Sequence, residues 1–330
     1  MGEFELIERY FRRGAAARDD DAVLLGIGDD CALLQATSPG QVLAVSSDML
    51  IEGRHFFAGS DPVAVGHKSL AVNLSDLAAM GAQPLGFTLA IALPALDEAW
   101  LDGFCPGLFA LADRFACPLV GGDTTRGPLA ISITVFGQVP PGQALRRDGA
   151  RPGDELWVSG PLGGASLAVA ARKRGDAAVD TGAARRLDWP QPQVDLGLLL
   201  RGVAHAAIDL SDGLAGDLRH VLAASSGATG QSGATSPSVE LMAELFAADI
   251  PLDPSLAGLP ARAALGYALH GGDDYELLFT AAPGDHDRIR TLWPTAGMIG
   301  RLRAGRGILL TCPDGGSEPV ERTGFDHFAP

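Results

Sequence analysis

Apolar and polar positions alternate along this chain with two different periods, which mark short strands and longer helices. Alternating or continuous apolar runs predict strands at 42–45, 85–93, 118–120, 129–135, 155–158, 206–208 and 277–279, and the short run at 42–45 predicts a buried strand. Apolar positions at helical spacing predict helices at 4–11, 62–80 and 97–115, a helix that ends near 172, and a further helix that begins at Gly213. Strands that alternate with helices in this way are typical of an α/β (α+β) fold.

The segment 62–80 is the longest predicted helix, and it begins at Pro62, a residue that helices favour in their first turn. Ser69, Asn73 and Asp76 share one face, at positions i, i+4 and i+7. Such a polar stripe is commonly solvated, but the flanking residues here are small and apolar, which is typical of a buried helix. In the buried alternative, Asp76 is a charge that needs a partner or a metal ion.

The composition of the chain changes near its middle. A length of 330 residues favours two domains over one, and the segment 139–154 is rich in Pro, Gly and Arg, as linkers are. We therefore expect a first domain at 1–145 and a second at 146–330. A further bias towards Ser, Gly, Thr and Ala, from Ser225 to Ser238, predicts a surface loop.

Composition and charge narrow the possible partners. The net charge of −15 disfavours a nucleic acid, which is itself a polyanion. No apolar run is long enough to cross a bilayer, so we expect no membrane partner. The four cysteines form no C-x-x-C pair, which favours buried thiols in a cytoplasmic protein over a zinc or dithiol site.

Acidic residues next to Gly or Ser recur along the chain, mostly where apolar strands end. The first such site is Gly26-Ile27-Gly28-Asp29-Asp30, and the six acids of this kind are Asp30, Asp48, Asp76, Asp123, Asp212 and Asp273. A single Gly-Asp pair is ordinary turn chemistry, whereas six of them favour a shared site. Carboxylate and hydroxyl oxygens suit Mg²⁺, which proteins hold through one or two carboxylates together with substrate phosphates.

Phosphate binding in this chain needs a device other than a lysine-containing loop. The only lysines, Lys68 and Lys173, do not follow a Gly, so the G-x-x-x-x-G-K-[ST] pattern is missing. The paired glycines Gly121 and Gly122 precede Asp123, and exposed backbone N–H groups of this kind bind phosphate oxygens. We therefore expect a nucleotide site built from backbone, acids and metal.

Four segments carry a resemblance to a known family: 26–30, 73–81, 121–125 and 209–213. In this order, together with Gly-Asp-Asp-Tyr-Glu at 272–276 and Asp-His-Phe at 326–328, they resemble the bacterial thiamine-monophosphate kinases. Single motifs are shared more loosely with aminoimidazole ribonucleotide synthetase and selenophosphate synthetase. The resemblance implies the two-domain fold of that superfamily, with an N-terminal ATP- and Mg²⁺-binding domain whose sheet pairs across a homodimer, and a C-terminal α/β domain.

The resemblance also implies that the chain phosphorylates thiamine monophosphate with ATP, using several Mg²⁺ ions, to give thiamine diphosphate. The positions that match metal ligands are Asp30, Ser46, Ser47, Asp48, Asp76, Asp123, Asp209 and Asp212, of which Asp123 and Asp212 are also expected to be catalytic. The positions that match nucleotide contacts are Gly122, Asp123, Arg147 and Ser211, and those on the substrate side are His55, Asp273 and Phe325. Ser47 replaces a frequent Thr, and Asp273 replaces a common Glu, which shortens the side chain.

The chemistry of the residues agrees with this expectation. ATP adds negative charge to an acidic pocket, which is stable only with bridging cations, and phosphoryl transfer depends mainly on positioning and charge neutralisation. The acceptor is a phosphate monoester, largely dianionic at neutral pH, so direct in-line transfer needs no general base. Two alternatives stay open at this point: another ATP-dependent synthetase of the same superfamily, and a non-catalytic regulator that binds metal or nucleotide.

Overall fold

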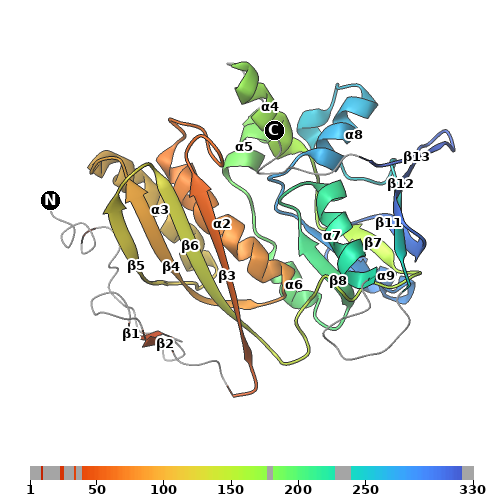
Figure 1. Ribbon diagram of the computed structural model, residues 1–330, viewed down its shortest axis with the longest axis horizontal. Coiled ribbons are helices and arrows are strands. Elements are labelled where there is room, and N and C mark those ends of the chain that lie inside the picture. Colours follow the sequence, from red (N-terminus) through yellow and green to blue (C-terminus); the bar gives the residue numbers. More distant parts are fainter. Residues whose placement is uncertain are drawn as a thin grey trace. The chain divides into compact units, whose positions relative to one another are not determined.

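The computed structural model describes residues 9, 23–25, 33–34, 39–176, 181–226 and 239–321 (Figure 1). The chain divides into two compact units. The first comprises Met1–Leu77 and Ala82–Gly142, and the second comprises Ala78–Gly81 and Gln143–Pro330. The main division, between Gly142 and Gln143, falls within the Pro-, Gly- and Arg-rich segment 139–154. Each unit is described by itself below.

The first unit is built on a four-stranded sheet in the order β3-β6-β4-β5. Its strands are β3 (Val42–Ile51), β4 (Gln83–Leu93), β5 (Leu119–Arg126) and β6 (Ala130–Val139), and the helices α2 (Pro62–Ala79) and α3 (Glu98–Arg114) lie along one of its faces (Figure 1). β6 pairs antiparallel with both β3 and β4, and β4 pairs parallel with β5. A short antiparallel pair, β1 (Val23–Leu25) and β2 (Leu33–Leu34), precedes this sheet in the chain.

Helices α2 and α3 confirm the sequence prediction for 62–80 and 97–115. α2 is buried on nearly all sides, and its polar residues Ser69 and Asn73 are both 0 % exposed, as the buried alternative requires. The two helices approach closely at Gly66 of α2 and Gly107 of α3. A Cβ at Gly66 would lie 2.0 Å from the backbone oxygen of Phe104, so only Gly allows this contact. This packing fixes α2, and with it the residues on its polar face.

The strand predicted at 42–45 differs from the structure in both length and burial. β3 runs through ten residues, Val42–Ile51, and forms an edge of the sheet. Val42, Leu43 and Val45 are 49 %, 50 % and 53 % exposed. A short apolar run predicts a buried strand, but an edge strand with helices on only one face leaves its other face open. Ser46, Ser47 and Asp48 consequently lie within the strand and not at its end.

The second unit is built on a seven-stranded, mostly antiparallel sheet in the order β13-β12-β9-β11-β7-β10-β8. Its strands are β7 (Glu155–Val158), β8 (Ala204–Asp209), β9 (Leu241–Phe246), β10 (Leu277–Ala281), β11 (Gly297–Ala304), β12 (Gly307–Thr311) and β13 (Ser317–Pro319). Its helices are α4 (Gly164–Arg174), α5 (Thr181–Asp188), α6 (Val194–Leu199), α7 (Leu214–Ser226), α8 (Ala261–His270) and α9 (His286–Leu292), with 3₁₀ turns η2 (Pro254–Leu256) and η3 (Pro283–Asp285). Among the described strands of this second sheet, β9 and β12 form the one parallel pair.

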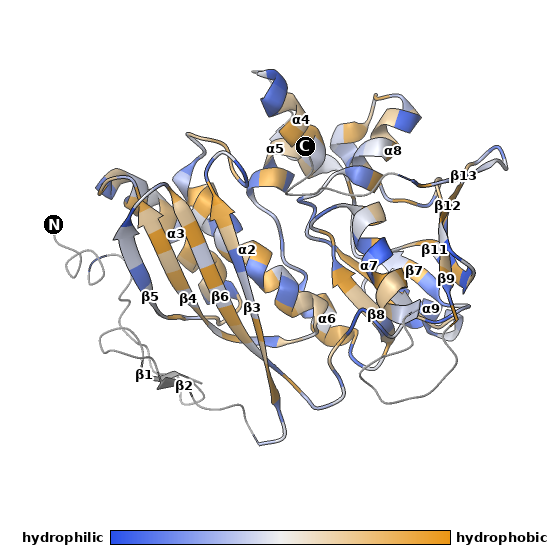
Figure 2. Ribbon diagram, viewed as in Figure 1, coloured by the Kyte–Doolittle hydropathy of each residue, from blue (hydrophilic) through white to orange (hydrophobic). Residues whose placement is uncertain are grey.

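Apolar residues cover both faces of the middle of this second sheet. Val158, Ile208 and Leu278 belong to a buried core that also includes residues of α7. The alternate residues Trp157 and Phe279 point to the opposite face, where their rings stack with centroids 6.3 Å apart. Colouring by hydropathy shows apolar residues along the central strands of each unit (Figure 2). Within the described ranges, no helix is both long and apolar enough to cross a membrane.

Candidate functional site

Polar residues of β3 and α2 meet on the helix-covered face of the first sheet. The Ser46 hydroxyl donates a hydrogen bond to the Asp76 carboxylate. The backbone N–H of Asp48 donates to the side-chain oxygen of Asn73, 3.0 Å away. The Asn73 amide group in turn donates to the backbone oxygen of Ser69, one turn earlier in α2, at 3.0 Å. These bonds hold Ser46, Asp48 and Asp76 together.

The two acids of this group repel each other. Burial, and secondly the neighbouring Asp76, raise the pKa of Asp48 from 3.8 to about 6. A divalent cation between the carboxylates would relieve that repulsion, and hard oxygen donors fit Mg²⁺. The described residues include no group of three or more His, Cys, Asp or Glu side chains that could hold a metal ion alone. Two carboxylates completed by substrate phosphates are nevertheless an ordinary Mg²⁺ arrangement.

Ser47 and His55 lie apart from this group. Side chains alternate along a strand, and the Ser47 hydroxyl lies 2.9 Å from that of Thr134 on β6, on the face opposite to Ser46 and Asp48. It also donates to the backbone oxygen of Ile133, at 3.2 Å. His55 follows the end of β3, and its Nδ1 accepts a hydrogen bond of 2.9 Å from the N–H of Ile51. These two side chains are therefore not brought to the Asp48–Asp76 pair within this unit.

Gly122 and Asp123 lie on β5, at the other edge of the sheet. The backbone of Gly122 has φ +154°, and a Cβ there would lie 1.8 Å from the backbone oxygen of Leu89, so the position requires Gly. Asp123 is exposed and lies opposite Ala90. β6 and β4 separate β5 from β3, which places the two edges roughly 14 Å apart in the plane of the sheet. The sheet itself does not bring Asp123 to Asp48.

The second unit brings two of the Gly- and acid-rich motifs into direct contact. The loop before β10 runs beside the segment that follows β8. Asp273 N–H donates to the backbone oxygen of Ser211 at 3.0 Å, and Tyr275 N–H donates to that of Leu210 at 2.8 Å. A Cβ at Gly272 would lie 2.2 Å from the Ser211 oxygen, so Gly is needed for this approach. A predicted substrate residue, Asp273, thus lies beside the predicted nucleotide residue Ser211.

Asp217 is an acid of this region that the sequence analysis missed. It lies in the first turn of α7, and its carboxylate accepts a hydrogen bond from the backbone N–H of Asp212 at 3.1 Å. Burial raises its pKa to about 8, and the charges of Asp209 and Asp212 add to the rise, whereas Arg147 opposes it. The spacing Asp-Gly-x-x-x-Asp at 212–217 could have indicated Asp217 as a site residue, because acidic side chains are favourable in the first turn of a helix.

These interactions bring Asp209, Asp212 and Arg147 into one electrostatic group around Asp217. The backbone oxygen of Arg147 also accepts a hydrogen bond of 2.8 Å from Ser225. Two predicted site residues, Asp30 and Phe325, lie outside the described residues. The predicted helix at 4–11, apart from Arg9, lies outside them too, as does most of the loop from Ser225 to Ser238, of which the first two residues end α7.

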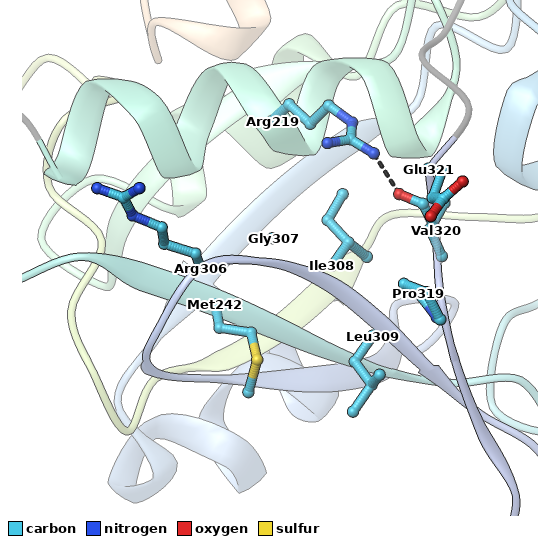
Figure 3. A pocket seen from close by; sticks show the side chains of 9 residues that line it. All are labelled: Arg219, Met242, Arg306, Gly307, Ile308, Leu309, Pro319, Val320 and Glu321. Carbon is cyan, nitrogen blue, oxygen red and sulfur yellow. Dashed lines mark hydrogen bonds between the residues drawn. The ribbon is translucent and has the colours of Figure 1, made fainter.

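A cavity of about 410 Å³ lies elsewhere in the second unit (Figure 3). It is lined by Arg219, Met242, Arg306, Gly307, Ile308, Leu309, Pro319, Val320 and Glu321, none of which is a predicted site residue. The Arg219 guanidinium points across it and donates a hydrogen bond to the backbone oxygen of Val320 (Figure 3). This cavity is therefore separate from the motifs described above.

The fold and its Gly- and acid-rich loops define a protein of the AIR synthase related class. The family model described as AIR synthase related protein, N-terminal domain, matches residues 28–139. Over 337 residues the chain is 41 % identical to the thiamine-monophosphate kinase of Escherichia coli strain K12, covering 99 % of this chain and 98 % of the relative. The chain belongs to the thiamine-monophosphate kinase family.

Solved structures agree with this assignment. The thiamine-monophosphate kinase of Stenotrophomonas maltophilia K279a is 44 % identical and superposes with a TM-score of 0.82, covering 96 % of this chain and 97 % of the other. AaThiL, solved in complex with AMPPCP and TMP, is 28 % identical with a TM-score of 0.74, covering 89 % of each chain. The family and fold class expected from the sequence are thereby confirmed, whereas sheet pairing across a dimer stays a prediction.

Proposed function

We propose that this chain transfers the γ-phosphate of ATP to thiamine monophosphate and so makes thiamine diphosphate and ADP. The observation that carries the proposal is the identity of 41 % over 99 % of the chain with a thiamine-monophosphate kinase. The complex of AaThiL with AMPPCP and TMP supports the pair of substrates. The contact between the 209–213 and 271–276 segments supplies acids and backbone groups suited to phosphorylated ligands.

Several of the chain's residues suit the binding of metal and phosphate. Asp48 and Asp76, with the Ser46 hydroxyl, form one oxygen donor set, and Asp209 and Asp212 form another. Mg²⁺ bound there would neutralise charge on the phosphates. We propose Asp30 and Ser47 as further ligands on the family resemblance, and Asp123 and Asp212 as the acids nearest the transfer. Gly122, Arg147 and Ser211 are the proposed nucleotide contacts, and His55, Asp273 and Phe325 the proposed substrate contacts.

The transfer itself is a direct in-line displacement. A phosphate oxygen of thiamine monophosphate forms a bond to the γ-phosphorus while the bond to the bridging oxygen of ADP breaks, and ADP leaves with the electron pair. The acceptor oxygen is already anionic at neutral pH, so no residue has to remove a proton from it. The work left to the protein is to orient both anions and to exclude water.

We also propose that the chain is a homodimer that pairs through the first sheet. The face of β3 opposite α2 carries Val45, Met49 and Ile51, which are 53 %, 55 % and 40 % exposed. Apolar side chains exposed in a row on an edge strand are typical of a contact surface. A cytoplasmic location fits the cysteines Cys105 and Cys117, which are buried and free thiols.

One coupled experiment tests the catalytic proposal. The purified chain is incubated with Mg²⁺, ATP and thiamine monophosphate, and both ADP and thiamine diphosphate are quantified. We expect the two products in equal amounts. A parallel incubation with aminoimidazole ribonucleotide precursors tests for a synthetase, and turnover with those instead of thiamine monophosphate would contradict the proposal. Binding of ATP without turnover of any acceptor would indicate a regulator.

A further inference from the structure

We propose that a cluster of one half-buried arginine and three buried acids, Arg186, Asp253, Asp274 and Glu276, positions the Asp273 loop for thiamine monophosphate. This Arg186 cluster lies within the second unit. Its proposed role in substrate positioning rests on the proposed function. Its members do not touch substrate in the proposal. They are positioning residues, which hold the backbone of the loop in the one conformation that places Asp273 beside Ser211.

The loop has a backbone that most residues avoid. Asp273 and Tyr275 have φ values of +69° and +50°, in the left-handed region, which is uncommon for residues with a side chain. Gly271 precedes them, and a Cβ there would lie 2.1 Å from the side chain of Ser166. Two left-handed residues on either side of Asp274 persist only when surrounding contacts impose them.

Asp274 supplies the first of these contacts. Its side chain is buried, and its two carboxylate oxygens accept hydrogen bonds from the backbone N–H of Gly163 at 3.0 and 2.9 Å. Gly163 is the N-cap residue of α4, with φ +90°. The middle of the loop is therefore attached to the start of a helix that lies about 110 residues earlier in the chain.

Glu276 supplies the second contact. One of its carboxylate oxygens accepts a hydrogen bond from the Ser159 hydroxyl, and the other lies 3.0 Å from a terminal nitrogen of Arg186. The Nε of Arg186 forms an ion pair of 3.2 Å with Asp253. The same guanidinium donates a hydrogen bond to the backbone oxygen of Pro161. One arginine thus joins the base of the loop to two other segments.

The charge of the cluster makes Arg186 hard to replace. The Arg186 guanidinium pairs with Asp253 and Glu276, and its charge also acts on Asp274. Burial raises the pKa values of Asp274 and Glu276, and the charge of Arg186 opposes that rise. Loss of the cation would leave buried carboxylates without compensation. The cluster holds Asp274 and Glu276 through their side chains. The neighbouring residues bond to the 209–213 segment instead: the Asp273 N–H donates to the Ser211 oxygen and the Tyr275 N–H to the Leu210 oxygen. A shift in the cluster therefore moves the loop against the 209–213 segment.

The test uses two conservative variants and a matched control. Asp274→Asn keeps the shape of the side chain but leaves only one oxygen to accept from the Gly163 N–H. Arg186→Lys keeps the positive charge but loses the planar guanidinium, which can bind two acids at once. The control pair is Asp188→Asn and Arg172→Lys. Arg172 and Asp188 form another Arg–Asp ion pair of the same unit, between α4 and α5, outside the cluster. Steady-state kinetics and amide hydrogen exchange are measured on all four variants and on the unchanged chain.

We expect Asp274→Asn and Arg186→Lys to raise KM for thiamine monophosphate roughly tenfold or more, since a small misplacement of a positioning group is costly. KM for ATP should stay within roughly twofold, and amides at 271–276 and 210–213 should exchange faster. The control variants should change neither quantity. If Arg186→Lys does not fold, Asp274→Asn decides the question.

Unchanged KM for thiamine monophosphate in folded Asp274→Asn would overturn the positioning role, as would an equal rise in both KM values with unchanged exchange at 271–276. Failure of the proposed function is distinguishable, because the unchanged chain would then show no turnover of thiamine monophosphate at all. In that case the hydrogen exchange still reports whether the cluster holds the loop, since it needs no substrate.

Discussion

Replacing Asp48 by Asn should make the metal-free protein more stable while it lowers activity. The ionised carboxylate of Asp48 is unfavourable in the fold, because burial and Asp76 raise its pKa from 3.8 to about 6. A rise in pKa from 3.8 to about 6 corresponds to about 3 kcal/mol of unfolding free energy. Asn has the same shape without the charge, so it removes this penalty.

The pH dependence of this effect has a definite sign. A carboxyl group whose pKa is raised by folding contributes its full stability below the unfolded pKa of 3.8, and loses it as the pH rises through about 6. At pH 7.5 Asp48 is ionised in the folded state, so Asp48→Asn should raise the unfolding free energy by up to about 3 kcal/mol. Below pH 3.8 the two proteins should differ little from this cause.

Urea unfolding followed by circular dichroism, in EDTA, measures the difference at pH 7.5 and at pH 4. The matched control is Asp102→Asn, at an exposed position on α3, which should change stability by no more than about 0.5 kcal/mol. Adding Mg²⁺ should stabilise the unchanged protein more than Asp48→Asn, because the variant lacks one donor. Equal stability of the two proteins at pH 7.5 in EDTA, or the same gain at both pH values, would refute the reasoning.

Three further predictions concern the first unit. Gly122→Ala should lower the melting temperature in a thermal scan, since its Cβ would lie 1.8 Å from the Leu89 oxygen, and an unchanged melting temperature would contradict that geometry. Ser46→Ala should raise the Mg²⁺ concentration needed for half-maximal activity more than Ser47→Ala, because their hydroxyls lie on opposite faces of β3; the reverse order in a Mg²⁺ titration would count against the Ser46 site. Met49→Lys should shift sedimentation towards the monomer, and a monomeric unchanged chain at micromolar concentration would rule out the dimer.

Much of the fold could be predicted from periodicity, but the exposure of β3 could not. α2 and α3 follow the apolar spacing closely, because both helices bury most of their circumference. The apolar run at 42–45 gives no sign that one face of its strand lies open. Whether a strand lies at an edge depends on the strand order, which is a property of the whole sheet and not of the run itself.

The sequence pattern also picks out acids beside Gly and Ser, without predicting which of them meet. Asp48 and Asp76 come together because β3 lies against α2, whereas Asp123 lies across two intervening strands from β3. Turn chemistry identifies each site locally. The distances between sites depend on strand order and register, which local patterns do not encode.

The members of the Arg186 cluster, which the sequence did not indicate, share one property: each acts through a partner far away in the chain. Arg186 and Glu276 are 90 positions apart, and Asp274 meets Gly163 across 111. An Arg in a short polar helix and an acid in a Gly-rich loop are each commonly solvated, so neither indicates burial by itself. A buried acid, however, requires a donor or a cation. Once Asp274 and Glu276 are known to be buried, each needs a partner, which is the Gly163 N–H for Asp274 and Arg186 for Glu276. These two contacts flank Tyr275 and follow Asp273, the two residues with a left-handed backbone.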